Sequence, residues 1–409
     1  MGPMPTTSSR NLALLFFCVF LVMAGYGITL PVFPFYTERI ASMGGISNHG
    51  LALQVGLLTS VYVFMQFVSA PFWGSQSDRL GRKPLILIGV AGYAIGQVFY
   101  GLSTSLPMLY SFRVLGGLFS AALLPAATSY VADVTEEKRR TSGMAWLGAM
   151  TSLGVIVGPS LDTLLSRTGL RFSLRYGGLL IDHFSVPFLA AGGLALVSLP
   201  LAIRGLDETY HPSTQALPKQ KRVQSWRAAA KTTLPLLALL WISQYGLTTF
   251  AATFALYAQR KLSYGPARVG VAFTVCGLVM AIVQVGVVKL SKYDHGEHAL
   301  IASGFGLMGV GLIFLLLTQD FTWILGAIAV MALGQALIAP NLLSSISKVG
   351  SEHKGAALGL ADAAGSLGQT VGPLVGTVLF SWKAESPFWL TGLLLIVVAL
   401  TSSRLRVEK

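Results

Sequence analysis

The sequence is poor in charged residues. Only 11% of its 409 residues are Asp, Glu, Lys or Arg, whereas soluble domains usually carry about 25%. Hydrophobic residues make up 53% of the chain, and they recur in runs of about 20 residues, the length that spans a bilayer as a helix. A single soluble core is therefore excluded, and the lipid bilayer is the expected surrounding of the chain.

Cysteine and histidine are also scarce. Cys18 and Cys276 lie in apolar runs in opposite halves of the chain, so we expect both to pack and neither to form a disulfide or bind a metal. All six histidines fall between the runs or at their ends, and neither a zincin motif nor a paired-aspartate motif is present. No phosphate-binding glycine loop precedes Lys-Ser or Lys-Thr, which disfavours ATP drive. We expect no cofactor and no resident metal, and a membrane-embedded enzyme is disfavoured.

Acidic residues are the rarer of the two charge types, with 16 against 29 basic residues, and the net charge is +13. The cations lie in short gaps between apolar runs rather than on one soluble face, so they indicate membrane topology and not nucleic-acid binding. Most of them fall on one side if the N-terminus is cytoplasmic. The first run is too long for a secretory signal. We therefore expect a multi-pass protein of the cell membrane with cytoplasmic N- and C-termini.

The apolar runs predict an all-α membrane protein with twelve transmembrane helices in two pseudo-symmetric six-helix bundles. The expected bundles are residues 1–204 and 232–409, joined by a cytoplasmic linker at 205–231 that contains Pro212 and Pro218 and has no apolar periodicity. The expected fourth span is 107–131. An outer stretch, 166–183, contains Arg171, Arg175 and Tyr176, which suggest an interfacial helix.

An internal repeat supports the division into two bundles. The segment from Ser152 to Pro159 is echoed by the segment from Ser366 to Pro373, each in the fifth span of its half. Small residues four apart allow helices to pack closely, and proline bends a helix. The expected helix-packing residues are Gly154, Gly158, Pro159, Gly368, Gly372 and Pro373.

The loop 74–83 between the second and third spans carries the strongest motif. Glycine permits close helix approach at Gly74 and a tight turn at Gly81, while acidic Asp78 can face a helix N-terminus. The loop resembles the signature loop of the major facilitator superfamily, which implies the fold of that superfamily and an inner gate that includes a carboxylate at the end of the fourth helix. The gating residues are then Gly74, Asp78, Arg79, Gly81, Arg82, Lys83 and Asp133.

Three charged residues lie within the expected spans. Arg113, in Arg113-Val114-Leu115-Gly116-Gly117, resembles the buried-arginine motif of the same superfamily, although a snorkelling or structurally paired arginine is the alternative. Asp162 follows the Gly-Pro segment, and Asp362 shares a helical face with Ser366 and Gln369. An ionisable residue within a membrane is by default a functional candidate. We take Asp362, Arg113 and Asp162 as proton-coupling candidates, with a structural hydrogen-bond role as the alternative for Asp362.

Polar and aromatic residues at other span positions suggest a lumen for amphiphilic compounds. Tyr26 lies in an expected Gly-Tyr-Gly break of the first span, ahead of Pro31 and Pro34. Each such residue alone is better explained by packing than by contact with a substrate. The cavity candidates are Tyr26, Tyr62, Gln66, Gln244, Tyr245, Phe250, Gln335, Asn341, Ser366 and Gln369.

Over essentially its whole length the chain is most similar to the bacterial drug:proton antiporters of the quinolone and tetracycline exporter type. That resemblance implies a monomer that exports small lipophilic or amphiphilic compounds by alternating access, with a proton as the coupling ion. The sequence departs from the type in having Ala251, Ala252 and Gln335 where some of these exporters have acidic residues, and Asp162 where the glycine pattern continues. A proton-coupled symporter or a uniporter for a small polar solute is the alternative, and a non-transporting receptor is a more distant one.

Overall fold

The structure is a computed structural model that describes residues 6–46, 48–167, 173–176, 179–209, 219–290, 297–349 and 354–402. Apart from one two-stranded hairpin, the described elements are helices. Nine of these helical spans are long and apolar enough to cross a membrane, and α10 and α13 are shorter apolar helices. The described chain divides into two compact units, the first mainly from residues up to 213 and the second mainly from residues after 213. Residues 55–60 group with the second unit and residues 265–274 with the first.

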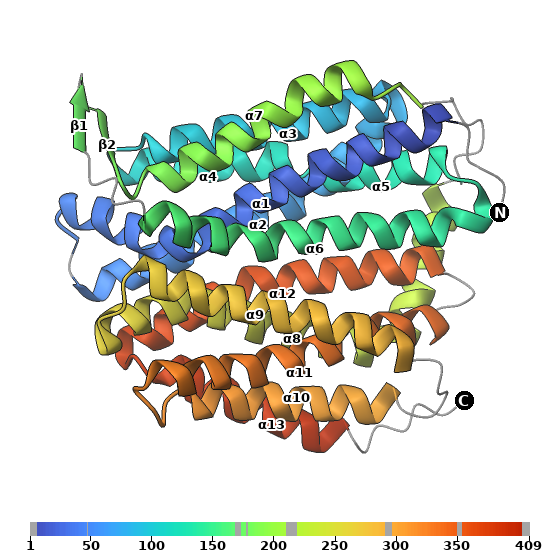
Figure 1. Ribbon diagram of the computed structural model, residues 1–409. Helices are drawn as coiled ribbons and strands as arrows, with labels where there is room; N and C mark the ends of the chain where they lie inside the picture. The colour runs from blue at the N-terminus through green and yellow to red at the C-terminus, as the bar shows by residue number, and fades with distance from the viewer. Residues whose placement is uncertain are drawn as a thin grey trace. The chain divides into compact units, whose positions relative to one another are not determined.

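The first unit is built from helices that Figure 1 draws in blue to green. In it α1 packs against α6 and α7, and α3 packs against α4, α5 and α7. The bounds are α1 Thr6–Met43, α2 Asn48–Leu80, α3 Arg82–Gly101, α4 Leu106–Ser120, α5 Leu123–Val134, α6 Glu137–Arg167 and α7 Val186–Gly205.

The second unit is also a bundle of helices. In it α8 packs against α12, α11 and α13, and α10 packs against α11 and α13. The bounds are α8 Lys219–Leu262, α9 Pro266–Leu290, α10 Glu297–Phe314, α11 Phe321–Val349, α12 Lys354–Trp382 and α13 Ser386–Ser402. Helix α8 begins at Lys219, inside the expected linker, so part of that linker is helical.

The expected fourth span is two helices in the structure, α4 and α5, which meet at Ala121 and Ala122. Pro125 lies in the first turn of α5 and has no N–H to donate to the carbonyl of Ala121. The backbone N–H of Ala122 instead donates to the carbonyl of Phe119 at 3.1 Å, a tighter turn than that of an α-helix.

Helix α1 runs without interruption through Pro31 and Pro34, so the predicted break at Tyr26 was wrong. Close packing accounts for the glycines on either side of Tyr26. A Cβ at Gly25 would lie 3.0 Å from the carbonyl oxygen of Ala191, and one at Gly27 would lie 2.6 Å from that of Val155.

The outer stretch is a β-hairpin and not the expected interfacial helix. Strand β1, Ser173–Tyr176, pairs antiparallel with β2, Leu179–Asp182. The two residues between the strands are both glycine in the sequence, which is a hairpin signal that the helical interpretation overlooked. Asp182 ends β2, forms an ion pair with Arg39 of α1, and accepts hydrogen bonds from the backbone N–H groups of Phe184 and Ser185 at 3.1 and 3.3 Å.

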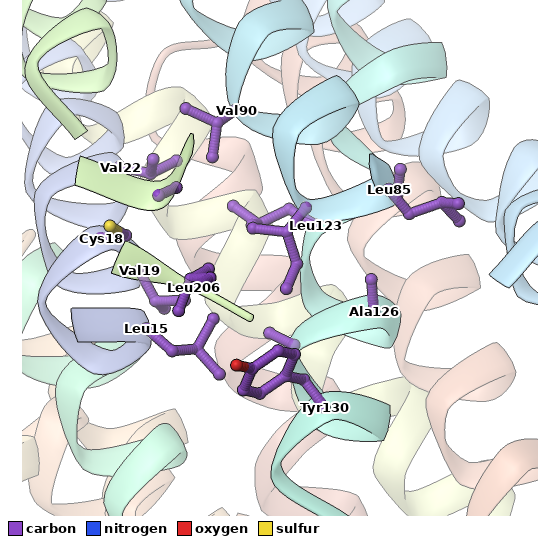
Figure 2. Packing of buried hydrophobic residues seen from close by; sticks show 14 of the residues in the cluster. Leu15, Cys18, Val19, Val22, Leu85, Val90, Leu123, Ala126, Tyr130 and Leu206 are labelled. Atoms are coloured by element: carbon purple, nitrogen blue, oxygen red, sulfur yellow. The ribbon is translucent and has the colours of Figure 1, made fainter. Parts of the chain in front are cut away.

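A buried apolar cluster holds the first unit together (Figure 2). Side chains of α1 meet side chains of α3 and α5 there, with Leu206 after α7 completing the contact; the labelled members are Leu15, Cys18, Val19, Val22, Leu85, Val90, Leu123, Ala126, Tyr130 and Leu206. Both cysteines are free and buried, as predicted, and Cys18 Sγ donates to the Ser198 carbonyl at 3.5 Å.

Candidate transport site

Charged side chains and one glycine fix the loop between α2 and α3. Arg82 Nε donates to Asp133 Oδ2 at 3.0 Å, and Arg82 Nη1 donates to Ser77 Oγ at 2.8 Å. Asp133 lies in the last turn of α5, so this ion pair joins the start of α3 to the end of the fourth span. Gly81 has φ +99°, a left-handed conformation that confirms the predicted tight turn.

Other gating residues differ from expectation or lie outside the described residues. No atom of the described chain lies within 4 Å of a Cβ built on Gly74, so the predicted close helix approach there was wrong. The side chain of Asp78 lies outside the described part of the chain, and Arg79 is exposed. The loop is therefore organised by Arg82 and Gly81 in this structure.

The sequence prediction missed Glu208, which follows α7. Its carboxylate accepts hydrogen bonds from the backbone N–H groups of Arg82 at 2.9 Å and Lys83 at 3.2 Å, the first turn of α3. A negative charge at this position is favoured by the helix dipole. Lys83 Nζ donates in turn to the Ile203 carbonyl at 2.8 Å. The available signal was an acidic pair, Asp207-Glu208, placed directly after a span in a region otherwise rich in cations.

Arg113 lies in α4 and is only 8% exposed. Its guanidinium carbon lies 4.1 Å from the ring centroid of Phe33, 4.5 Å from that of Tyr100 and 5.2 Å from that of Tyr62. Aromatic faces stabilise a cation in this arrangement. Among the described residues, no carboxylate forms an ion pair with it.

Two of the predicted cavity residues, Tyr62 and Gln66, come together on α2. Tyr62 Oη lies 3.0 Å from Ser120 Oγ, and Gln66 Nε2 donates to the same oxygen at 3.1 Å. Because the Tyr62 ring also lies against Arg113, these side chains form a polar and aromatic wall of the first unit.

Asp162 lies in α6 with no exposed surface, and neither of its carboxylate oxygens has a hydrogen-bond partner among the described residues. An ionised carboxylate in such surroundings carries a desolvation cost of several kcal/mol that nothing here offsets, on the order expected for an unpaired buried charge. A carboxylic acid that carries a proton avoids this cost.

Asp362 occupies a different environment on α12. Its side chain is exposed, and Ser366 and Gln369, on the same helical face, are half-buried. No ion pair is formed by Asp362 in the described part of the chain. The three residues thus present the polar face that the spacing predicted.

The repeated Gly-Pro segments pack the fifth span of each unit against the first. A Cβ on Gly154 would lie 2.6 Å from Met23 Cβ, and one on Gly158 would overlap the backbone of Gly27. In the second unit a Cβ on Gly368 would overlap the Trp241 carbonyl, and one on Gly372 would lie 2.7 Å from the Tyr245 carbonyl. Close packing is therefore confirmed at these glycines, ahead of Pro159 and Pro373.

The remaining cavity candidates divide by burial. Tyr26 and Gln244 are half-buried, and Tyr245 stacks on Trp241 with ring centroids 5.7 Å apart. Three others are enclosed within the second unit: Phe250 packs on Phe254, Asn341 Nδ2 donates to the Leu337 carbonyl at 2.7 Å, and Gln335 is 1% exposed with its Oε1 unpaired among the described residues. Phe250 and Asn341 are thereby accounted for by packing within the unit.

Known proteins resemble this chain over nearly its whole length. A multidrug resistance protein of Bacillus subtilis, multidrug resistance protein 1, is 28% identical over 96% of this chain and 95% of its own. The quinolone resistance protein NorA of Staphylococcus aureus is 24% identical over 93% of each chain.

Solved structures share the fold. The human organic anion transporter MFSD10 matches with a TM-score of 0.70 and 22% identity, covering 98% of this chain and all of that one. A peptide transporter POT in complex with sulfate matches with a TM-score of 0.72 and 16% identity, covering 97% and 95%. The sequence model of the Major Facilitator Superfamily matches residues 15–293 and 236–409. Taken with the six-plus-six order of spans and the loop between α2 and α3, this match shows that the chain belongs to the Major Facilitator Superfamily.

Proposed function

We propose that this chain is a proton-coupled exporter of small lipophilic or amphiphilic compounds, working by alternating access as a monomer in the cell membrane with both termini in the cytoplasm. The relatives named for multidrug and quinolone resistance, which match it along nearly its whole length, support the substrate class. The distribution of cations between the expected inner and outer gaps supports the orientation.

One observation carries the coupling mechanism: Asp162 is fully buried in a span and has no partner among the described residues. In the proposed orientation α6 runs from the inside to the outside, so Asp162 lies toward the outer end of its helix. A proton that arrives from outside would occupy this carboxylate while it is enclosed. Release of the proton to the inside, in the conformation that gives the carboxylate access to water there, would then be linked to substrate export.

Asp362 is the rival proton carrier. Its side chain is exposed in this structure, whereas that of Asp162 is enclosed and would need a conformational change to exchange its proton, as alternating access to the two sides requires. This difference in burial is the reason for placing Asp162 first. Arg113, enclosed by the rings of Phe33, Tyr100 and Tyr62, remains a further candidate.

The test uses purified protein in liposomes with a pH dye inside, an imposed proton gradient, and a panel of lipophilic cations, quinolones and tetracyclines. We expect substrate-dependent proton movement in wild type and its loss in Asp162→Asn, with substrate counterflow retained because counterflow needs no net proton transfer. Asp362→Asn is the matched control and should remain coupled.

The outcomes separate the alternatives. Loss of coupling in Asp362→Asn but not in Asp162→Asn would move the proton site to α12. Uptake of polar solutes in oriented vesicles, with no movement of any compound on the panel, would establish the symporter or uniporter alternative instead. An absence of any flux would favour a non-transporting receptor.

A further inference from the structure

Tryptophan is distributed unevenly between the two units. Of the seven tryptophans in the chain, only Trp73 and Trp146 precede residue 213. Trp73 is 7% exposed, and its Nε1 donates to the Leu118 carbonyl at 2.6 Å. Trp146 lies nearer the start of α6 than its end. In the proposed orientation both positions are toward the inner side, so the first unit has no tryptophan at the outer ends of its helices.

Three tryptophans of the second unit lie within one turn of a helix end. Trp323 is the third residue of α11, Trp382 is the last residue of α12, and Trp389 is the fourth residue of α13. In the proposed orientation α11 and α13 begin, and α12 ends, on the outer side. These tryptophans are 62%, 80% and 43% exposed, respectively. Three large aromatic side chains are thus presented outward near one level of the second unit.

The connections that carry these tryptophans are tied to the outer end of α8. Tyr264, which follows α8, donates from its hydroxyl to the carbonyl of Gln319 at 3.0 Å, just before α11. Between α12 and α13, the backbone N–H of Trp389 donates to the carbonyl of Glu385 at 3.2 Å. Glu385 is also the ion-pair partner of Lys261 in α8. The tryptophans are therefore held at fixed positions on the second unit.

The surroundings that suit these side chains are the headgroup layer of a bilayer. An indole has a large apolar body and one N–H donor, and it accumulates where hydrocarbon meets water. From Trp389, exposed apolar residues continue along one face of α13 to Leu393 and Val397, at i+4 and i+8. Lys383, which directly follows Trp382, is exposed and suits lipid phosphate. A stripe that continues toward the bilayer centre indicates lipid as the partner of this surface.

We propose that Trp323, Trp382 and Trp389 form an anchor that binds the headgroup layer of the outer leaflet and fixes the depth and tilt of the second unit. Aromatic and basic residues at span ends are the groups that set tilt. Because the first unit has no tryptophan at its outer helix ends, the movement of the transport cycle relative to the bilayer is assigned to that unit. This inference rests on the proposed function for its orientation and its movement, whereas the anchor itself requires no transport.

Tryptophan fluorescence in vesicles measures the depth of each side chain. The full-length protein retains one tryptophan, with phenylalanine at the other six positions, and the lipids carry bromine, which quenches indole, either near the headgroup or near the chain end. We expect Trp323, Trp382 and Trp389 to lie about 15 Å from the bilayer centre, half of the hydrocarbon thickness. Their depths should agree within about 5 Å, the rise of one helical turn. Trp73 is the matched control, and either lipid should quench it little because it is buried.

Two further measurements keep the outcome clear. If the variants with a single tryptophan do not fold, each anchor tryptophan is replaced by phenylalanine in the otherwise unchanged chain. Each replacement should lower quenching by the lipid with bromine near the headgroup, and Trp73→Phe should not. A quencher that cannot cross the bilayer should reach the anchor from the outside of right-side-out vesicles. Access only in inside-out vesicles would overturn its assignment to the outer leaflet.

A reporter on the first unit tests the assignment of movement. Phe99 lies two residues before the end of α3 and is 44% exposed, so Phe99→Trp places an indole at the outer end of that unit. In a variant whose only tryptophan is at this position, a saturating quinolone should change the measured depth by several ångströms. The same addition should leave the depths of the three anchor tryptophans unchanged.

The outcomes separate the anchor from the exporter. Depths near the bilayer centre, or depths of the three tryptophans that disagree by more than a helical turn, would overturn the anchor. Equal shifts of the anchor and of the reporter, or no shift of either while flux proceeds, would overturn the assignment of movement to the first unit. Anchor depths as expected, with no flux of any compound on the panel, would retain the anchor and remove the proposed exporter.

Discussion

Replacing Gly158 by alanine tests the closest helix contact in the first unit. A Cβ at this position would overlap Gly27 Cα and the Gly27 carbonyl carbon, and would lie 2.5 Å from the backbone nitrogen of Ile28. All three atoms belong to backbone, so no side chain can rotate to make room. The whole of α1 or α6 must shift to admit one methyl group.

The magnitude follows from the cost of overpacking. Forcing an extra carbon into a closely packed contact costs about 1–3 kcal/mol. Replacement of a glycine within a helix by alanine returns up to about 1 kcal/mol through helix propensity. Gly148 lies on the same helix, and a Cβ built on it would meet no atom of a neighbouring element within 4 Å. Gly148→Ala therefore gains the helix propensity of alanine without the cost of overpacking. The difference between the two variants should therefore be about 1–3 kcal/mol.

Unfolding of both variants and of wild type in the same detergent, by heat and by titration with a denaturing detergent, measures this difference. We expect Gly158→Ala to unfold at a clearly lower temperature and Gly148→Ala to match or exceed wild type. Equal stability of the two alanine variants would show that α1 and α6 do not approach as closely as the geometry indicates. Gly372→Ala against Gly365→Ala repeats the test in the second unit, because the nearest atom to a Cβ on Gly365 is Gln244 Cγ at an ordinary 3.7 Å.

Two further predictions concern charges at helix ends. Glu208→Gln removes the charge that caps α3 and should cost about 0.5–2 kcal/mol, visible as faster hydrogen exchange at the amides of Arg82 and Lys83; unchanged exchange would refute the cap. Lys261 Nζ lies 2.8 Å from Glu385 Oε1, just before α13, and its hydrogen bond holds the pKa of that carboxyl below its usual range. Because the folded pKa is the lower one, the stabilisation is present above the ordinary glutamate pKa of about 4.3 and is lost as the pH falls through the folded value. Lys261 is 50% exposed, so we expect at most about 1 kcal/mol, absent in Lys261→Gln when melting is followed from about pH 7 to pH 3.

The spans and the turn at Gly81 were predictable because each depends on local composition. Runs of apolar residues fix where a helix crosses a bilayer, and Gly81 needs only its own backbone conformation to make the turn. The prediction failed where a contact distant in sequence decides the outcome. Glu208 caps a helix that begins more than a hundred residues earlier, and no spacing rule relates two such positions.

The candidate site shows the same division. Arg113 and Asp162 stood out in the sequence because charge is rare within spans. The environments of these two residues could not be predicted from the sequence. The rings around Arg113 come from α1, α2 and α3, and the burial of Asp162 depends on the packing around α6. Asp362 stood out by its helical face, and its side chain is exposed, whereas Asp162 is fully buried.

The internal repeat bears on both acids and gives an independent reason to treat the buried Asp162 as functional. When Ser152 is aligned with Ser366, Gly158 aligns with Gly372, and both glycines pack a fifth span against a first. In the same alignment Asp162 corresponds to Gly376, and Asp362 corresponds to Gly148. Each carboxylate therefore stands where the other unit builds the same helix with glycine, so neither acid is required by the helix packing that the two units share. A buried acid that the scaffold does not need is retained at a cost in stability, which is the expected trade when a residue serves transport.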